Sequence, residues 1–266
     1  MMRPASPARR PGPLAAVGLS LAALTSANFA IVAFVVLAPE LQLEFGFSKA
    51  EVGFLISLVF IGGALTSYPA GRLTDRLGPA TVLGWALGLF SVAMLATAVA
   101  PNVAVFLVLI ALGGVAYGGV NPPTNVAVAS SFDQRLGFFL SVKQSGVPLG
   151  GLVAGVVLPP IVIAAGWRWG LVTAALSCML VVAATPLLRG ARVIVRDGVA
   201  PGVRSPLSRR ELAALGAFGF VMSGTQWSIF AHLTLFLTEE RAFSLASAGL
   251  GLALAQGLGA GAHLVW

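Results

Sequence analysis

The sequence predicts an all-α, polytopic membrane helix bundle, and three observations support that fold class. Of the 266 residues, 58% are hydrophobic and only 9% are charged, and the mean hydropathy is +0.94, which is too apolar for a soluble domain. The apolar residues form uncharged runs of about 20 residues or more, the length that a helix needs to cross a bilayer. These runs lack the alternation of barrel strands, so helices are the remaining way to satisfy the backbone inside lipid.

We expect eight helices, because eight such runs follow one another, separated by charges, prolines or polar turns. They span residues 14–39, 52–71, 79–100, 103–132, 136–165, 169–188, 212–238 and 244–266. The first run is longer than the apolar core of a signal peptide, so it is expected to be a retained helix. The basic, proline-rich residues 1–13 before it are expected to form a disordered cytoplasmic tail.

The positions of the basic residues predict the orientation in the membrane, because short cytoplasmic loops retain Lys and Arg. With the N-terminus in the cytoplasm, 13 of the 16 Lys and Arg residues lie on the inner side, and Lys49, Arg168 and Arg241 lie outside. The sequence therefore predicts an integral protein of the cell (inner) membrane. Nucleic-acid binding, another common meaning of a net charge of +7, requires a solvated basic face that this sequence lacks.

An internal repeat predicts the domain organisation. Residues 34–70 match residues 230–266 at eleven of 37 positions, among them the pair Glu44 and Glu240 and the pair Gly53 and Gly249. Shared apolar composition accounts for about four or five such matches. The first two helices are therefore expected to recur as the seventh and eighth.

The repeat divides the chain into two six-helix halves, of which the second is expected to be incomplete. Residues 14–188 are the expected N-terminal half, residues 189–211 a basic central cytoplasmic loop, and residues 212–266 the first two helices of the C-terminal half. Ala70 aligns with the last residue, Trp266, so helices nine to twelve are missing from the expected plan. Either the sequence is truncated, or a short protein completes its bundle by pairing with another chain.

Two motifs and the six-plus-six plan give the chain a resemblance to the major facilitator superfamily of secondary transporters. GRLTDRLG, from Gly71 to Gly78, is similar to the family's loop signature between helices two and three. GVPLGG, from Gly146 to Gly151, is similar to a Gly-Pro-x-x-Gly-Gly pattern of helix five. Two departures are the replacement of the usual basic residues by Pro79 and Ala80, and the lack of an arginine in helix four.

The resemblance implies a carrier that moves a small solute, such as an organic anion or a drug-like molecule, by alternating access. No cofactor and no enzymatic activity are expected, because the sequence has no phosphate loop, no HExxH and no GxSxG motif. Two histidines and one cysteine do not suggest a metal site. The alternative function is a membrane remnant or scaffold that does not transport.

The resemblance also implies a conformational latch at Gly71, Arg72, Asp75, Arg76 and Gly78. A helix C-terminus carries partial negative charge, which favours the two arginines and disfavours Asp75. The aspartate is therefore expected to contact the N-terminus of a helix from the opposite half. In the alternative reading, the segment is a solvated loop whose arginines only set the topology.

Helix five is expected to pack closely on two faces. Lys143, Gly146 and Gly150 share one stripe, and Gln144, Pro148 and Gly151 share another. Glycines four residues apart let helix backbones approach, and Pro148 removes a backbone hydrogen bond and should bend the helix. A packing role with a hinge function is expected for these residues.

Polar residues inside the helices are candidates for a substrate cavity. Lys143 either faces inward, where it would attract an anion, or extends to the cytoplasmic surface. The acidic residues lie in cytoplasmic regions or at the outer rim, so His232 is the deepest candidate for a coupling proton, and facilitated transport stays open. Each of these residues could instead bond neighbouring helices. The candidates are Asn28, Tyr117, Asn121, Asn125, Lys143, Gln144, Gln226 and His232.

Overall fold

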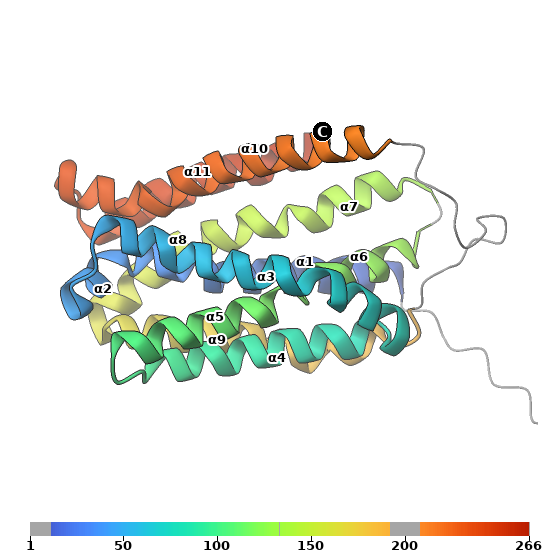
Figure 1. Ribbon diagram of the computed structural model, residues 1–266, viewed down its shortest axis with the longest axis horizontal. Coiled ribbons are helices and arrows are strands. Elements are labelled where there is room, and N and C mark those ends of the chain that lie inside the picture. The colour runs from blue at the N-terminus through green and yellow to red at the C-terminus, as the bar shows by residue number, and fades with distance from the viewer. Residues whose placement is uncertain (1–11, 133, 192–207, 266) are drawn as a thin grey trace, which may run out of the picture.

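The structure, a computed structural model, describes residues 12–132, 134–191 and 208–265, and these residues form helices and turns without a strand. This confirms the predicted all-α fold class. Most of the expected tail and most of the expected central loop, residues 1–11 and 192–207, lie outside the described residues. Figure 1 shows long helices lying side by side in a bundle, with α10 and α11 along one side.

The helices follow the order of the expected runs, although several runs are divided. The α-helices are α1 (Pro13–Val36), α2 (Ala38–Phe45), α3 (Lys49–Leu77), α4 (Pro79–Ala98), α5 (Val103–Tyr117), α6 (Asn121–Ala129), α7 (Leu136–Gln144), α8 (Gly146–Ala165), α9 (Trp167–Ala184), α10 (Arg209–Leu235) and α11 (Leu245–Val265). A 3₁₀ turn, Thr185–Leu188, follows α9, and a π-helical turn, Phe236–Glu240, follows α10.

Within residues 12–132, 134–191 and 208–265, seven segments are long and apolar enough to cross a membrane. They are α1, α3, α4, the pair α5 and α6, the pair α7 and α8, α9, and α11; α10 is not among them, although it has 27 residues. In α1, 83% of the apolar window is buried, against 33% to 50% in the other six. Helix α1 is therefore the centre of the described bundle, and the others expose apolar faces that suit lipid.

Three expected helices are interrupted, and each interruption precedes a proline. The first run breaks after Val36, before Pro39, and the fourth breaks at residues 118–120, before Pro122. The fifth breaks at Ser145, before Pro148. Proline has no backbone N–H for the carbonyl four residues earlier, and its ring clashes with that carbonyl. The helix that contains Pro148 is therefore divided at Ser145 into α7 and α8, and the bend expected from Pro148 stays a prediction.

The motif GRLTDRLG is not a loop, contrary to the expected helix end at Gly71. Helix α3 continues through the motif to Leu77, and Thr74 is buried there with its hydroxyl donating to the Ala70 carbonyl at 2.7 Å. Gly78 ends the helix with a φ of +84°, which glycine adopts without strain, and Pro79 starts α4. The motif therefore forms the last two turns of α3 and a tight connection to α4.

Capping boxes fix the starts of α3 and α10. Ser48 and Glu51 exchange hydrogen bonds before α3, and Ser208 and Glu211 do the same before α10. The backbone N–H of Ser208 donates to the Glu211 carboxylate at 2.6 Å, which holds the pKa of that carboxyl below its usual value. We call the end of the bundle where α3 begins and α10 ends the Lys49 end. The opposite end is the Asp75 end.

Candidate functional site

Lys143 of α7 is buried, and its side chain points toward α6. The Lys143 side chain is only 1% exposed, and its ammonium donates to Asn121 Oδ1 at 2.6 Å, to Asn125 Oδ1 at 2.6 Å and to Thr124 Oγ1 at 3.3 Å. An ammonium has three N–H donors, so each of them has an acceptor. The structure thus brings together Lys143, Asn121 and Asn125 from the predicted set, and we call these residues with Thr124 the lysine cluster.

The break between α5 and α6 positions the acceptors of the cluster. Helix α6 begins at Asn121, directly after the turn, and Asn125 and Thr124 follow at the spacings that share one helix face. The Thr124 hydroxyl also donates to the Asn121 carbonyl at 2.7 Å. Helix α1 covers the cluster, because the buried hydroxyl of Ser20 donates to the Thr124 carbonyl at 3.4 Å.

The Lys143 ammonium is charged, but the three oxygens that accept its hydrogen bonds are neutral. Amide and hydroxyl oxygens orient the ammonium but do not cancel its charge. The three ion pairs within the described part of the chain involve Lys49 and Arg168, at the Lys49 end. The structure therefore places the Lys143 charge inside the bundle rather than at the surface, and the cluster can accept an anion by exchanging one neutral oxygen for a charged one.

Asn28 lies beside Gly150 of α8, and Tyr117 lies beside Gly63 of α3. Asn28 is fully buried, and its amide nitrogen donates to the Leu24 carbonyl at 3.0 Å, whereas its Oδ1 has no hydrogen-bond partner among the described residues. The Tyr117 ring packs against Phe60 and Phe90, with ring centroids 6.1 and 5.9 Å away. The stripe expected from Tyr117 to Asn125 is thus divided by the turn that starts α6.

The remaining predicted cavity residues lie elsewhere. His232 is at the Lys49 end, with Nε2 3.3 Å from the Lys49 carbonyl, so it is not part of the lysine cluster. Gln226 is exposed on α10, where its neighbour Trp227 packs against Phe60 of α3 at 4.8 Å between ring centroids. Gln144, next to Lys143, is half-buried.

The glycines of α8 contact two different helices. A Cβ at Gly146 would lie 2.6 Å from the Leu21 carbonyl of α1, and one at Gly150 would overlap the backbone of the same helix. On the other face, a Cβ at Gly151 would lie 2.6 Å from the Gln256 side chain of α11. Pro148 lies on this second face as well, 3.6 Å from the Cβ position of Gly259. Gly146 and Gly150 of the first stripe therefore pack against α1, and Pro148 and Gly151 of the second pack against α11.

Thr124 and Gln256 were missed by sequence reasoning. Thr124 follows Asn121 by three residues, so the spacing that selected Asn125 could also have selected it. Gln256 is 5% exposed and follows Gly249 by seven residues, which puts both on the face of α11 that meets α8. Gly151 was the sequence signal for this contact, because a glycine on a helix face leaves room for a side chain from the helix opposite it.

The latch residues lie at the Asp75 end of the bundle. Arg72, Asp75 and Arg76 are exposed in the last turns of α3, and Gly71 and Gly78 are half-buried. Among the described residues, no hydrogen bond or ion pair to the Asp75 carboxylate is recorded. A contact between Asp75 and the opposite half stays a prediction.

The cavities and the polar cluster do not coincide. An apolar cavity of about 400 Å³ lies between α1, α8 and α9, where Thr25 and Ser177 are among its lining residues. Another, of about 460 Å³, lies between α3, α4 and α5. The described residues also contain no group of three His, Cys, Asp or Glu side chains that could hold a metal ion. The lysine cluster is therefore the candidate site, on the basis of its charge and burial.

Comparisons of the sequence with known proteins point to membrane carriers. A family model described as Major Facilitator Superfamily matches residues 18–266. The chain is 32% identical over 155 residues to a gentisate transporter of Corynebacterium glutamicum, covering 58% of this chain and 33% of that protein. It is 32% identical over 139 residues to a niacin transporter of Acinetobacter baylyi, with coverages of 52% and 31%. It is 30% identical over 189 residues to a 4-hydroxybenzoate transporter of Pseudomonas putida, with coverages of 68% and 42%.

The chain thus spans between 31% and 42% of the length of these three relatives. Solved structures share its fold. One is a bacterial homolog of the human lysosomal transporter Spinster in an inward-facing and occupied conformation, with a TM-score of 0.74, 17% identity, and coverage of 90% of this chain and 57% of that chain. Another is a D-xylose-proton symporter, with a TM-score of 0.65, 15% identity, and coverages of 93% and 66%.

Proposed function

The chain belongs to the Major Facilitator Superfamily, as its motifs had indicated, and on that premise we propose that it carries a small organic anion across the membrane by alternating access. We further propose that the membrane is the cell (inner) membrane, with the N-terminus in the cytoplasm and the Lys49 end outside. The distribution of Lys and Arg supports this orientation.

The observation that carries the proposal is the buried ammonium of Lys143, which is held by Asn121, Thr124 and Asn125. A charge at the centre of a membrane helix costs about 3 kcal/mol, so buried charges in such helices are retained for function. A carboxylate in contact with this ammonium would supply the counter-charge that the asparagine oxygens do not. We propose that the ammonium exchanges an asparagine oxygen for a solute oxygen as the two halves open.

The named relatives support a particular class of anion. Gentisate and 4-hydroxybenzoate, which two of them are named for, are aromatic carboxylates. The aromatic rings of Phe60, Tyr117 and Trp227 form a row from α5 across α3 to α10. We propose that the solute is a small aromatic carboxylate, whose carboxylate contacts Lys143 and whose ring suits apolar and aromatic surroundings.

Uptake into proteoliposomes tests the proposed function. The purified chain should take up radiolabelled 4-hydroxybenzoate with saturable kinetics, whereas uptake of uncharged 4-hydroxybenzamide should stay at the level of protein-free vesicles. Gentisate and nicotinate should compete with the labelled solute. If none of these anions enters faster than in protein-free vesicles, the proposed solute class is wrong, and a remnant or scaffold that does not transport becomes the alternative to test.

Asp75 provides a second test, which concerns the latch. Changing Asp75 to asparagine should lower the transport turnover several-fold, because a neutral amide contacts a positive helix N-terminus more weakly than a carboxylate does. The change Asp75→Glu keeps the charge and should retain more of the turnover. Initial rates at saturating solute measure both variants, and an undiminished rate with asparagine would show that the segment only sets the topology.

A further inference from the structure

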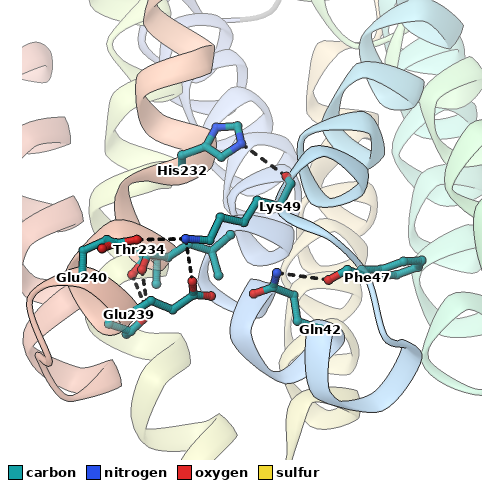
Figure 2. Close-up of polar contacts among 9 residues, drawn as sticks. Gln42, Phe47, Lys49, His232, Thr234, Glu239 and Glu240 are labelled. Carbon is teal, nitrogen blue, oxygen red and sulfur yellow. Dashed lines mark hydrogen bonds and ion pairs between the residues drawn. The ribbon is translucent and has the colours of Figure 1, made fainter.

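We propose that Lys49, Glu239 and Glu240 form an ion-pair gate that holds the two halves together at the Lys49 end. The Lys49 ammonium lies 2.8 Å from Glu239 Oε2 and 3.1 Å from Glu240 Oε1. Figure 2 shows it reaching from the start of α3 to the two carboxylates that follow α10. The gate rests on the alternating access proposed above. It adds that the ion pairs of Lys49 must break when the Lys49 end opens.

The position of Lys49 in α3 favours a role outside its own helix. Ser48 is the N-cap of α3, so Lys49 is the first helical residue. A helix N-terminus carries partial positive charge, which disfavours a cation there. The ammonium therefore gains little from α3, and its favourable contacts are those with the carboxylates across the interface.

The end of α10 is shaped to present both carboxylates to one cation. Consecutive residues of an α-helix point about 100° apart, so adjacent glutamates do not normally face the same partner. Here the chain widens into the π-helical turn Phe236–Glu240, and both Glu239 and Glu240 contact Lys49. Such π-helical turns are rare and occur frequently at functional sites.

His232 adds a second contact between the same two elements. Its Nε2 lies 3.3 Å from the Lys49 carbonyl, and its Nδ1 lies 3.1 Å from the Ser228 carbonyl within α10. The ring can approach α3 because residue 53 is a glycine, whose Cβ position lies 3.3 Å from the ring. The gate is therefore supported by a close packing contact on its inner side.

Helix α10 loses contact with α3 away from the gate. Residues 210–226 of α10 are exposed, and burial begins only at Trp227, which packs against Phe60 of α3. The described contacts between α10 and α3 thus concentrate toward the Lys49 end. Alternating access opens one end of a carrier while it closes the other, so the Lys49 gate must open before the solute can pass this end.

The first half contains a matched ion pair that does not cross the interface. Arg168 Nη2 at the start of α9 lies 2.9 Å from Glu44 Oε1 of α2, and Glu44 is the residue that the internal repeat aligns with Glu240. The exposed side-chain fractions are similar, at 49% for Arg168 and 52% for Lys49. Lys49 contacts two carboxylates across the interface, whereas Arg168 contacts one within the first half, so Arg168 provides the control for an exposed ion pair that does not join the halves.

Distance measurements between spin labels test the gate without any solute. Cys178 is the only cysteine, so a Cys178→Ser chain can carry labels at Leu43→Cys on α2 and Phe243→Cys after α10. Both sites are exposed. Pulsed electron–electron double resonance in liposomes then gives the populations of short and long distances between the two labels across the Lys49 end.

Lys49→Gln, and separately Glu239→Gln with Glu240→Gln, should raise the ratio of long to short distances about two- to fivefold, the range expected when exposed ion pairs are lost. Arg168→Gln should leave the ratio unchanged. Reversing the charges, with Lys49→Glu, Glu239→Lys and Glu240→Lys together, should restore the short distance.

An unchanged ratio in Lys49→Gln would overturn the gate, as would an equal rise in Arg168→Gln. Because no solute is present, these outcomes are independent of the uptake assay. A chain that fails to carry anions can still show the gate, and an active carrier can lack it.

Discussion

Replacing Lys143 with glutamine is expected to raise the KM for 4-hydroxybenzoate at least about tenfold. Glutamine can still form hydrogen bonds with Asn121 and Asn125, but it removes the one positive charge of the cluster. Loss of one partner of a buried charge pair costs roughly 2 kcal/mol or more, and 1.4 kcal/mol corresponds to a factor of ten in binding. Initial uptake rates over a range of solute concentrations measure the effect.

Asn125→Asp tests the same charge without changing Lys143, because it alters only one of the side chains that contact the ammonium. The new carboxylate would take the place of an oxygen that now lies 2.6 Å from the ammonium, so the chain would supply its own counter-anion. We expect a similar rise in KM, without loss of folded protein. If both variants fold and transport with the KM of the original chain, Lys143 serves only to join α6 to α7.

Three of the eight candidate cavity residues, Lys143, Asn121 and Asn125, meet in the lysine cluster, and the sequence did not show how they would meet. The spacing of Asn121 and Asn125 put them on one helix face, and the depth of Lys143 in its apolar run marked it as a candidate. The direction of the Lys143 side chain stayed open, because it depends on α6, a neighbour that sequence periodicity does not identify. His232 shows the same limit, since its position along α10 was readable but its contact with the start of α3 was not.

Helix existence was predictable from the apolar runs, whereas helix boundaries depended on packing. Breaks precede Pro39, Pro122 and Pro148, yet α3 continues through Pro69 and α8 through Pro159. A proline frees a carbonyl in each case, and the surrounding structure decides whether the helix continues. For the same reason, the glycine at position 71 did not end α3: the helix continued until Gly78, where positive φ and the following proline leave no helical alternative.

Replacing Gly155 with leucine is expected to detach α11 from α8. A Cβ at Gly155 would overlap the Gly249 carbonyl and lie 2.9 Å from the Ala253 nitrogen, so both obstacles are backbone atoms that cannot rotate away. Overpacking a well-packed site typically costs 1–3 kcal/mol, and we expect about 3 kcal/mol or more here because a whole helix must shift. Thermal unfolding in detergent, followed by tryptophan fluorescence, should show a lower Tm.

Gly88→Leu is the matched control, because Gly88 also lies within a long helix, α4, and its Cβ position has no other atom within 4 Å. This variant should keep the Tm of the original chain, since leucine there extends into open space and has a better helix propensity than glycine. An equal loss of Tm in both variants would mean that any added bulk disturbs the bundle. A loss confined to Gly155→Leu would mean that the close approach of α8 and α11 requires glycine, and that this contact contributes to holding α11 in the bundle.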